Sequence, residues 1–153
     1  MFICLLSIHG LIRSHDLELG RDADTGGQTK YVVDLASALA RHPDVDRVCL
    51  ITRLIRDSTV GPDYARQEDV LDDGARIVRI PCGPDEYIPK EQLWDHLDSF
   101  TDNLMQWLHV QDQMPTVIHS HYADAGYAGV RLSNLLGVPL VHTGHSLDRD
   151  KRK

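Results

Sequence analysis

Residues 2–7 read FICLLS and residues 139–143 read PLVHT, and these two almost wholly apolar runs decide the fold class. Strands that are apolar on both faces are covered on both faces, as the strands of a parallel sheet are. Three further strand-forming runs lie between them, at residues 47–52, 75–80 and 116–119. The sequence therefore predicts a sheet with helices on both of its sides.

The first of three predicted helices has a recognisable start. Thr25 precedes Gln28 by three residues, as in a capping box, and the helix should end near residues 42–43. Its apolar residues are spaced for one buried face, which we expect to consist of Tyr31, Val32, Leu35 and Leu39.

Two more helices are expected further along the chain. One runs from about residue 90 to residue 108 after Pro89, and the other from about residue 124 to residue 136, where Gly137 predicts a stop. Strands that alternate with helices in this way predict right-handed crossovers. The expected fold is therefore α/β, with a Rossmann-like, doubly wound and mostly parallel sheet.

Residues 1–153 should form a single domain of this kind. The polar segment at residues 57–74 is predicted to be an irregular surface excursion between two strands. Because the sequence stops just after the run at 139–143, we expect the domain to be incomplete.

The composition narrows the class of partner. Apolar residues make up 42% of the chain and charged residues 25%, which is the usual balance of a soluble globular domain. The formal net charge of -7 argues against nucleic acid, because phosphate backbones are held by clustered lysines and arginines. We therefore expect a small-molecule partner.

The cysteines and the first eight residues indicate where in the cell the protein is expected. Cys4, Cys49 and Cys82 show no C-x-x-C spacing, so neither a zinc site nor a disulfide framework is expected and the thiols should be reduced. Residues 1–8 are apolar but too few to cross a bilayer, and they lack a basic leading segment. A cytoplasmic protein without a membrane partner is the expectation.

Ligands of open α/β sheets bind beyond the carboxyl ends of the strands, so functional residues are expected in the loops that follow the strands. The first loop ends in GRDADTGGQ at residues 20–28. Gly26 and Gly27 lie at a helix amino terminus, where free N–H groups and the helix dipole favour a phosphate or pyrophosphate. The alternative is an ordinary glycine-containing turn capped by Thr25.

The second loop begins with His119, Ser120 and His121. A His-x-His pair can bind metal, but we expect strand alternation to point the two rings to opposite sides, and no acidic partner is evident. Packed or hydrogen-bonded histidines are predicted, and no metal.

The third loop carries Gly144, His145 and Ser146, with Arg149 and Lys151 close behind. An imidazole, a hydroxyl at a helix start and fixed positive charge together outline a sugar-phosphate site. A capped helix followed by a solvated basic turn is the alternative.

Together these segments resemble the sucrose-phosphate synthase family. The matches are collinear and extend over essentially the whole chain, and they comprise HGLIR (9–13), ELGRD (18–22), DTGGQ (24–28), KYV (30–32), TR (52–53), IPCGP (80–84), YIPKE (87–91), LW (93–94), HYADAG (121–126) and TGHSL (143–147). The segment at residues 83–87 is shorter than the family pattern and has no basic residue, and Asp148 stands where glycine is common.

The resemblance implies a retaining glycosyltransferase of the GT-B architecture. Such an enzyme transfers glucose from UDP-glucose to fructose 6-phosphate, without a cofactor, and makes sucrose 6-phosphate. The amino-terminal domain, to which this chain corresponds, would bind the acceptor. The nucleotide-sugar domain would be absent, so that this polypeptide alone would be inactive unless a complementary carboxyl-terminal chain supplied it.

The resemblance also assigns residues to substrates. Four side chains would hold fructose 6-phosphate, namely Lys90, Tyr122, Ser146 and Lys151. Gly26 and Gln28 would contact sugar phosphate, and Gly27 would leave room for the phosphates or glucose of the donor. His145 would bond the transferred glucosyl group as the catalytic histidine.

Two other functions stay open. Sucrose synthase, a sister enzyme, uses free fructose and would not need Lys90 and Lys151. A non-catalytic carbohydrate-binding or scaffold domain is the alternative from another class, because fold does not fix function. The enzymatic interpretation requires that the Gly26 turn, Tyr122 and His145 converge on one pocket.

Overall fold

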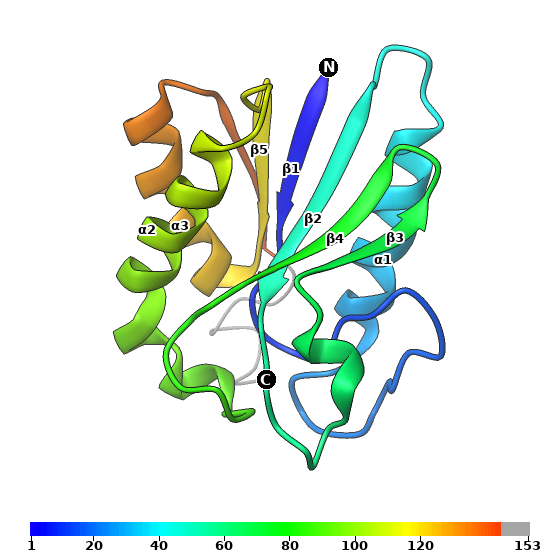
Figure 1. The fold of residues 1–153 in the computed structure, drawn as a ribbon, viewed down its shortest axis with the longest axis vertical. Helices are drawn as coiled ribbons and strands as arrows, with labels where there is room; N and C mark the ends of the chain where they lie inside the picture. Colours follow the sequence, from blue (N-terminus) through cyan, green and yellow to red (C-terminus); the bar gives the residue numbers. More distant parts are fainter. Residues whose placement is uncertain (145–153) are drawn as a thin grey trace.

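The computed structural model describes residues 1–144, in which one six-stranded sheet is covered by helices on both faces (Figure 1). The strands lie in the order β3-β4-β2-β1-β5-β6, and all neighbours are parallel except β3 and β4. Their bounds are Phe2–Leu6 (β1), Arg47–Arg53 (β2), Glu68–Asp72 (β3), Ala75–Ile80 (β4), Val117–His121 (β5) and Leu140–Thr143 (β6). This arrangement confirms the predicted α/β fold class.

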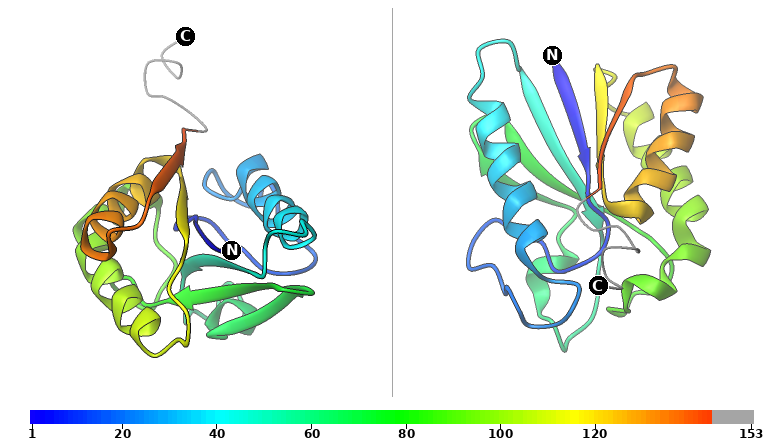
Figure 2. Two further views of the ribbon diagram at one scale, coloured as in Figure 1. Left: turned by 90° about the horizontal axis from the view of Figure 1, so that it is seen from above. Right: turned by 180° about the vertical axis from the view of Figure 1, so that it is seen from behind.

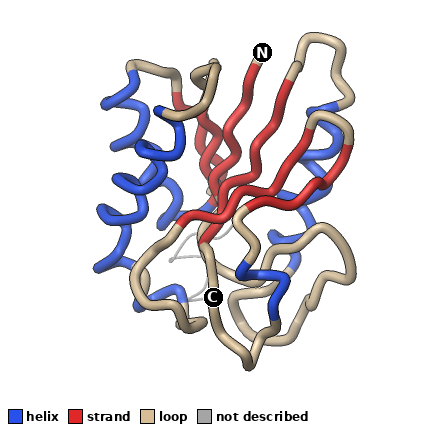
Figure 3. Tube along the Cα trace, in the orientation of Figure 1, coloured by secondary structure: helices blue, strands red, loops and turns tan. Residues whose placement is uncertain are grey.

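Three α-helices and three short 3₁₀ turns connect the strands. The helices are Gly27–Ala40 (α1), Leu97–His109 (α2) and Tyr122–Leu136 (α3), and the turns are Pro62–Ala65 (η1), Lys90–Gln92 (η2) and Trp94–His96 (η3). α1 covers one face of the sheet, whereas α2 and α3 lie side by side on the other (Figures 2 and 3). Among residues 1–144, no helix is long and apolar enough to cross a membrane.

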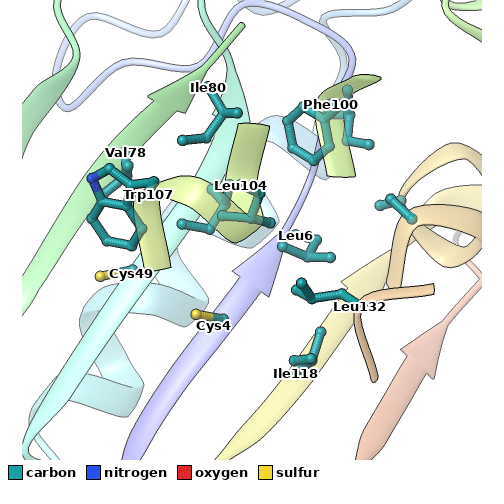
Figure 4. Close-up of a cluster of buried hydrophobic side chains, with 14 of the residues drawn as sticks. Cys4, Leu6, Cys49, Val78, Ile80, Phe100, Leu104, Trp107, Ile118 and Leu132 are labelled. Carbon is teal, nitrogen blue, oxygen red and sulfur yellow. The ribbon is translucent and has the colours of Figure 1, made fainter. Parts of the chain in front are cut away.

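Each face of the sheet buries its own apolar cluster because side chains alternate along the strands. Phe2, Cys4 and Leu6 of β1 point to α2 and α3, where Phe100 and Leu104 pack against the sheet (Figure 4). The intervening β1 residues belong to the second cluster, which lies under α1. The wholly apolar sequence of β1 thus follows from its position between two covered faces.

The strand β3 corrects the sequence prediction for residues 57–74, which was an irregular excursion. Residues 68–72 read EDVLD, with three carboxylates and only two apolar side chains. They pair antiparallel with β4 at the edge of the sheet, with Gly74 in the turn between the strands. Because an edge strand buries little, its sequence needs no apolar alternation, and the usual strand signal is missing.

The start of α1 also differs from prediction. Gly26 is the N-cap and no side chain caps the helix, so the predicted capping box does not form. Thr25 Oγ1 instead accepts a hydrogen bond from the Leu11 amide at 3.1 Å. Tyr31 is 47% exposed, and the buried face of α1 consists of Thr29, Val32, Val33 and Ala36.

The second predicted helix begins later than expected. Residues 90–96 form two 3₁₀ turns, and α2 starts only at Leu97. The backbone amide and the ammonium group of Lys90 both donate to Asp24, which ties this segment to the loop after β1. α3 starts at Tyr122, two residues before the predicted boundary, and its predicted stop at Gly137 is confirmed by a left-handed φ of 67°.

The chain reverses its direction of winding between β1 and β5, which are neighbours in the sheet. After β1 it continues through α1 toward β2, and after β5 it continues through α3, on the opposite face, toward β6. In open α/β sheets this reversal opens a crevice at the carboxyl ends of the strands, where ligands bind. The loop after β1 and the start of α3, which follows β5 directly, flank that crevice.

Candidate functional site

Two loops and the start of α3 meet at the carboxyl end of the sheet, where the winding reverses. The loop after β1 contacts the start of α3 through His9 and Tyr122, whose ring centroids lie 4.6 Å apart at an interplanar angle of 88°. It contacts the loop after β4 through Asp24 and Lys90. The structure thus brings the Gly26 turn, Tyr122 and Lys90 to one edge of the sheet.

His9 is the central buried residue of this edge, and the sequence analysis assigned it no role at the site. Its Nδ1 lies 2.8 Å from Asp124 Oδ2, and both side chains are 4% exposed. Its Nε2 lies 3.3 Å from Gln28 Nε2. One imidazole therefore connects the first turns of α1 and α3, on opposite faces of the sheet.

Asp124 is suited to the amino terminus of α3. Its Oδ1 accepts a hydrogen bond from the Ala125 amide at 2.8 Å, and the helix dipole favours a carboxylate at this position. The hydrogen bond between Asp124 and His9 gives each of these two buried polar side chains a partner, without which their burial would cost free energy.

Tyr122 lies in a conformation that is unusual for a residue with a side chain. Its φ is 74°, in the left-handed region that residues other than glycine rarely adopt. This conformation accompanies the abrupt change from β5 to α3. Such strain persists where the surrounding structure holds it, and it is common at ligand sites.

Gly26 and Gly27 leave open space at the start of α1. Among the atoms of residues 1–144, a Cβ atom on Gly27 would meet none within 4 Å, and one on Gly26 would meet only Gln28 Oε1, at 3.8 Å. No acidic residue occupies the first turn of α1 and no side chain caps it. The helix amino terminus is therefore accessible to an oxygen-rich or anionic group.

Lys90 is already paired within the protein. Its Nζ lies 3.2 Å from Asp24 Oδ1, and its amide donates to Asp24 Oδ2 at 2.8 Å. Burial lowers the pKa of the Lys90 ammonium, but the hydrogen bond and charge of Asp24 outweigh this, with smaller help from Glu91 and Tyr122, and the net pKa is raised. Lys90 is therefore a fixed cation that any phosphate must share with Asp24.

Tyr87 closes the loop after β4 onto the loop after β1. Its hydroxyl donates to Asp22 at 3.0 Å and lies 3.3 Å from Thr25 Oγ1. Burial is the main cause that raises the pKa of this phenol, and the Asp22 carboxylate adds to it. Beside these residues is a pocket of about 370 Å³, lined by Asp22, Ala23, Asp24, Tyr87, Ile88, Pro89 and Glu91.

The short segment at residues 83–87 is held by Arg53, at the end of β2. This guanidinium is 3% exposed and donates to the carbonyl oxygens of Cys82 at 3.0 Å and of Pro84 and Glu86 at 2.5 Å. Burial lowers the pKa of Arg53. The planar guanidinium group of Arg53 thus binds three carbonyl oxygens at once, which fixes the path of the loop that carries Tyr87 and Lys90.

Glu18 ties the middle of the loop after β1 to η1. It accepts a hydrogen bond from Tyr64 at 2.9 Å and pairs with Arg21 and with Arg13, the latter at 3.4 Å. Burial raises the pKa of Glu18, but the hydrogen bonds from Arg21 and Tyr64 outweigh this effect, so the net pKa is lowered. The loop is therefore closed onto η1 by this charged cluster.

The two histidines of β5 correct the prediction that their rings point to opposite sides. Residues two apart in a strand share a face, and the ring centroids of His119 and His121 lie 4.2 Å apart. His119 Nε2 is hydrogen-bonded to Thr143 Oγ1 at 2.8 Å. Within residues 1–144, no group of three or more histidine, cysteine or acidic side chains is arranged to hold a metal ion.

Several predicted site residues lie outside the described residues. They are His145, Ser146 and Lys151, and Asp148 lies there too. Their convergence with the Gly26 turn stays a prediction. Within the described part, three acidic residues line the pocket, namely Asp22, Asp24 and Glu91. The single positive charge of Lys90 does not balance them, so a phosphate would need additional positive charge.

Comparison with known proteins identifies the family. The model of the glycosyl transferase 4-like domain matches residues 26–153. The chain belongs to this family. Over 99% of its length it is 47% identical to probable sucrose-phosphate synthase 4 of Oryza sativa subsp. japonica and to sucrose-phosphate synthase 1 of Arabidopsis thaliana. It spans only 17% of the length of each of these relatives, and the alignments cover 178 positions.

Solved structures agree with this family assignment. A sucrose-phosphate synthase from Thermosynechococcus elongatus superposes with a TM-score of 0.80 over 98% of this chain and 34% of its own, at 28% identity. A second structure of that name and organism gives a TM-score of 0.69 at 24% identity over 99% of this chain and 66% of its own, which supports the fold alone. The predicted resemblance to sucrose-phosphate synthases is thereby confirmed.

Proposed function

We propose that this chain forms the acceptor side of a retaining sucrose-phosphate synthase, which transfers glucose from UDP-glucose to fructose 6-phosphate. The observation that carries the proposal is the convergence of the Gly26 turn, Lys90 and Tyr122 at the winding reversal. Similarity to sucrose-phosphate synthases over 99% of the chain supports it.

In this proposal each described residue has a defined task toward the acceptor. Gln28 and the open turn at Gly26 contact the sugar, and Gly27 leaves space for the donor. Tyr122 lines the crevice next to His9. Lys90 supplies part of the charge that the phosphate requires, and Asp24 fixes the position of its ammonium group.

The remaining tasks fall to residues outside the described part of the chain. Ser146 and Lys151 would complete the acceptor-phosphate site, and His145 would bond the glucosyl group. UDP-glucose would be held largely by a nucleotide-sugar domain, in the same polypeptide or in a complementary chain. No cofactor enters the proposed reaction, because UDP is the leaving group and its phosphates help to accept the proton of the acceptor hydroxyl.

We further propose that the protein acts in the cytoplasm on small sugar phosphates and nucleotide sugars. The three cysteines are buried and unpaired with one another, in keeping with reduced thiols. Neither nucleic acid nor a membrane is proposed as a partner, given the formal net charge of -7.

The decisive experiment compares fructose 6-phosphate, fructose and inorganic phosphate as ligands of the 153-residue chain. A ligand that binds only the folded state raises the thermal midpoint. The proposal expects a rise with fructose 6-phosphate that neither other compound produces. An equal response to fructose would favour sucrose synthase, and no response to any of the three would favour a scaffold domain.

Lys90 allows a matched test of the phosphate contact. Replacing Lys90 by glutamine should weaken fructose 6-phosphate binding at least about tenfold, or about 1.4 kcal/mol, because the ammonium group that pairs with Asp24 is lost. Lys30→Gln is the control, since Lys30 is 59% exposed and pairs with Asp34. Equal affinities of the two variants, measured by calorimetric titration, would exclude Lys90 from the site.

Catalysis should require more than this polypeptide. The chain alone, mixed with UDP-glucose and fructose 6-phosphate, is expected to form no sucrose 6-phosphate, because it spans 17% of the length of its relatives. Chromatographic detection of sucrose 6-phosphate would contradict this expectation.

A further inference from the structure

The connection between Asp124, His9 and Gln28 is buried and polar, and its hydrogen positions follow from the chemistry of its ends. Asp124 Oδ2 can only accept a hydrogen bond from the imidazole, so the proton lies on His9 Nδ1, 2.8 Å away. At the other end Gln28 Nε2 lies 3.3 Å from His9 Nε2 and 3.3 Å from the carbonyl oxygen of Asp24.

The Asp24 carbonyl decides the orientation of the Gln28 amide. A carbonyl oxygen is an acceptor, so the amide nitrogen of Gln28, rather than its oxygen, must face it. The same nitrogen then donates to His9 Nε2, which must carry a lone pair. The neutral imidazole with its proton on Nδ1 is the one form that satisfies all three partners.

The orientation determines what Gln28 presents to the crevice. With its nitrogen turned to His9 and Asp24, its oxygen Oε1 faces the space in front of Gly26, 3.8 Å from the position of a Cβ on that residue. Oε1 is an acceptor, so it selects a ligand hydroxyl at this position. A reversed amide would present a donor instead and would suit a phosphate or carbonyl oxygen.

We propose that His9, held by Asp124, is a positioning residue that fixes the Gln28 amide with its oxygen toward the ligand, so that the site recognises a hydroxyl group of the acceptor sugar. The proposal rests on the proposed acceptor function. It adds that Gln28 reads a hydroxyl and not the phosphate, and that the Gln28 side chain is oriented before the ligand arrives. Tyr122 packs edge-on against the same imidazole and restricts its rotation.

Two substitutions separate the bonds of the imidazole. In His9→Asn the side-chain amide can replace Nδ1–H toward Asp124, but it is too short to reach Gln28. In His9→Gln the longer side chain can offer an oxygen to Gln28 in place of Nε2, whereas Oδ2 of the buried Asp124 loses its partner. A purely structural role predicts that stability and sugar binding follow the same order in the two variants.

The positioning role predicts opposite orders. His9→Asn should be the more stable variant in urea unfolding, because Asp124 keeps its hydrogen bond. His9→Gln should bind fructose 6-phosphate at least about fivefold more tightly than His9→Asn. When Gln28 is replaced by alanine, the two variants should bind fructose 6-phosphate equally, because the side chain through which position 9 affects binding is then absent. Tighter binding by His9→Asn would overturn the proposal.

Nuclear magnetic resonance tests the hydrogen bonds without any ligand. In the ¹⁵N-labelled chain, the His9 signals should show a protonated Nδ1 and an unprotonated Nε2. The side-chain NH₂ signal of Gln28 should shift in His9→Asn and stay in place in His9→Gln. A protonated Nε2 would contradict the positioning role even if the sugar binds. The wild-type chain could show these signals and yet not bind fructose 6-phosphate. That result would contradict the proposed acceptor function but would support the hydrogen bonds assigned to His9.

Discussion

At the scale of single residues, the glycines of the loop after β1 divide into those that the fold needs and those that the proposed ligand needs. Gly10 has a φ of +87°, and a Cβ there would lie 2.6 Å from the Asp24 carbonyl oxygen. Gly26 has an extended backbone, with φ -117° and ψ -155°, and open space around it. Two substitutions by the same residue should therefore have different consequences.

Gly26→Ala should leave the free energy of unfolding within about 1 kcal/mol of the wild-type value, because alanine tolerates this backbone conformation. It should nevertheless weaken fructose 6-phosphate binding, since the methyl group fills the space that Gln28 Oε1 faces. Urea unfolding and calorimetry measure the two effects. Unchanged affinity would mean that the sugar does not approach the turn.

Gly10→Ala should destabilise the protein by at least roughly 1–2 kcal/mol from the backbone conformation alone. The overlap with the Asp24 carbonyl adds to this cost, because backbone atoms cannot move aside as a flexible side chain can. Urea unfolding would show the loss. If Gly10→Ala had the same free energy of unfolding as the wild-type chain, the loop would have adjusted to accommodate the added methyl group.

At the scale of elements, the loop after β1 should weaken in acid because Glu18 closes it onto η1. The pKa of Glu18 is lower in the folded protein than its ordinary value of 4.5. The stability that it contributes is therefore fully present above pH 4.5 and is lost as the pH falls through the lowered folded-state value. Glu18→Gln removes this contribution at every pH.

The measurement is the difference in free energy of unfolding between the wild-type chain and Glu18→Gln, at several pH values above and below 4.5. The difference should be constant at neutral pH and should shrink in acid. As a control, Glu91→Gln should give no comparable pH dependence, because Glu91 is 72% exposed and only loosely paired, at 3.8 Å from Lys90. A constant difference for Glu18→Gln throughout would show that the cluster does not form.

Sequence reasoning worked for elements with a strong local signal and failed where the signal is non-local. Residues 2–7 predicted β1 because both faces of the strand are covered. β3 was missed because an edge strand with three carboxylates has no apolar period. The site roles of the Gly26 turn and Tyr122 were assigned from sequence motifs and stay predictions. His9 and Asp124 could not be paired from the sequence, because 115 residues separate them and only the winding reversal brings them together.

At the scale of the whole molecule, the three thiols should report global unfolding. Cys4, Cys49 and Cys82 are buried in the core beneath α2 and α3. Burial raises the pKa of each thiol, to about 11 for Cys82, so the reactive thiolate is scarce as well as inaccessible. The native chain should resist alkylation, and the labelling rate should rise with urea in step with unfolding measured by circular dichroism.

The alkylation experiment has a clear negative outcome. Rapid labelling of any cysteine in the native chain would show that one side of the sheet opens locally, without unfolding of the rest. Mass spectrometry of the labelled chain would identify which thiol had reacted. Addition of fructose 6-phosphate should slow labelling if the sugar binds only the folded state.

The contact of Arg53 with three carbonyl oxygens has a kinetic consequence. A loop that is held in this way is already in place when a sugar arrives, so no slow rearrangement should precede or follow the encounter. In stopped-flow experiments the observed rate should rise linearly with sugar concentration, without a plateau. Arg53→Lys, which cannot bridge the same oxygens, should introduce a limiting rate that reflects the search of the loop for its binding conformation.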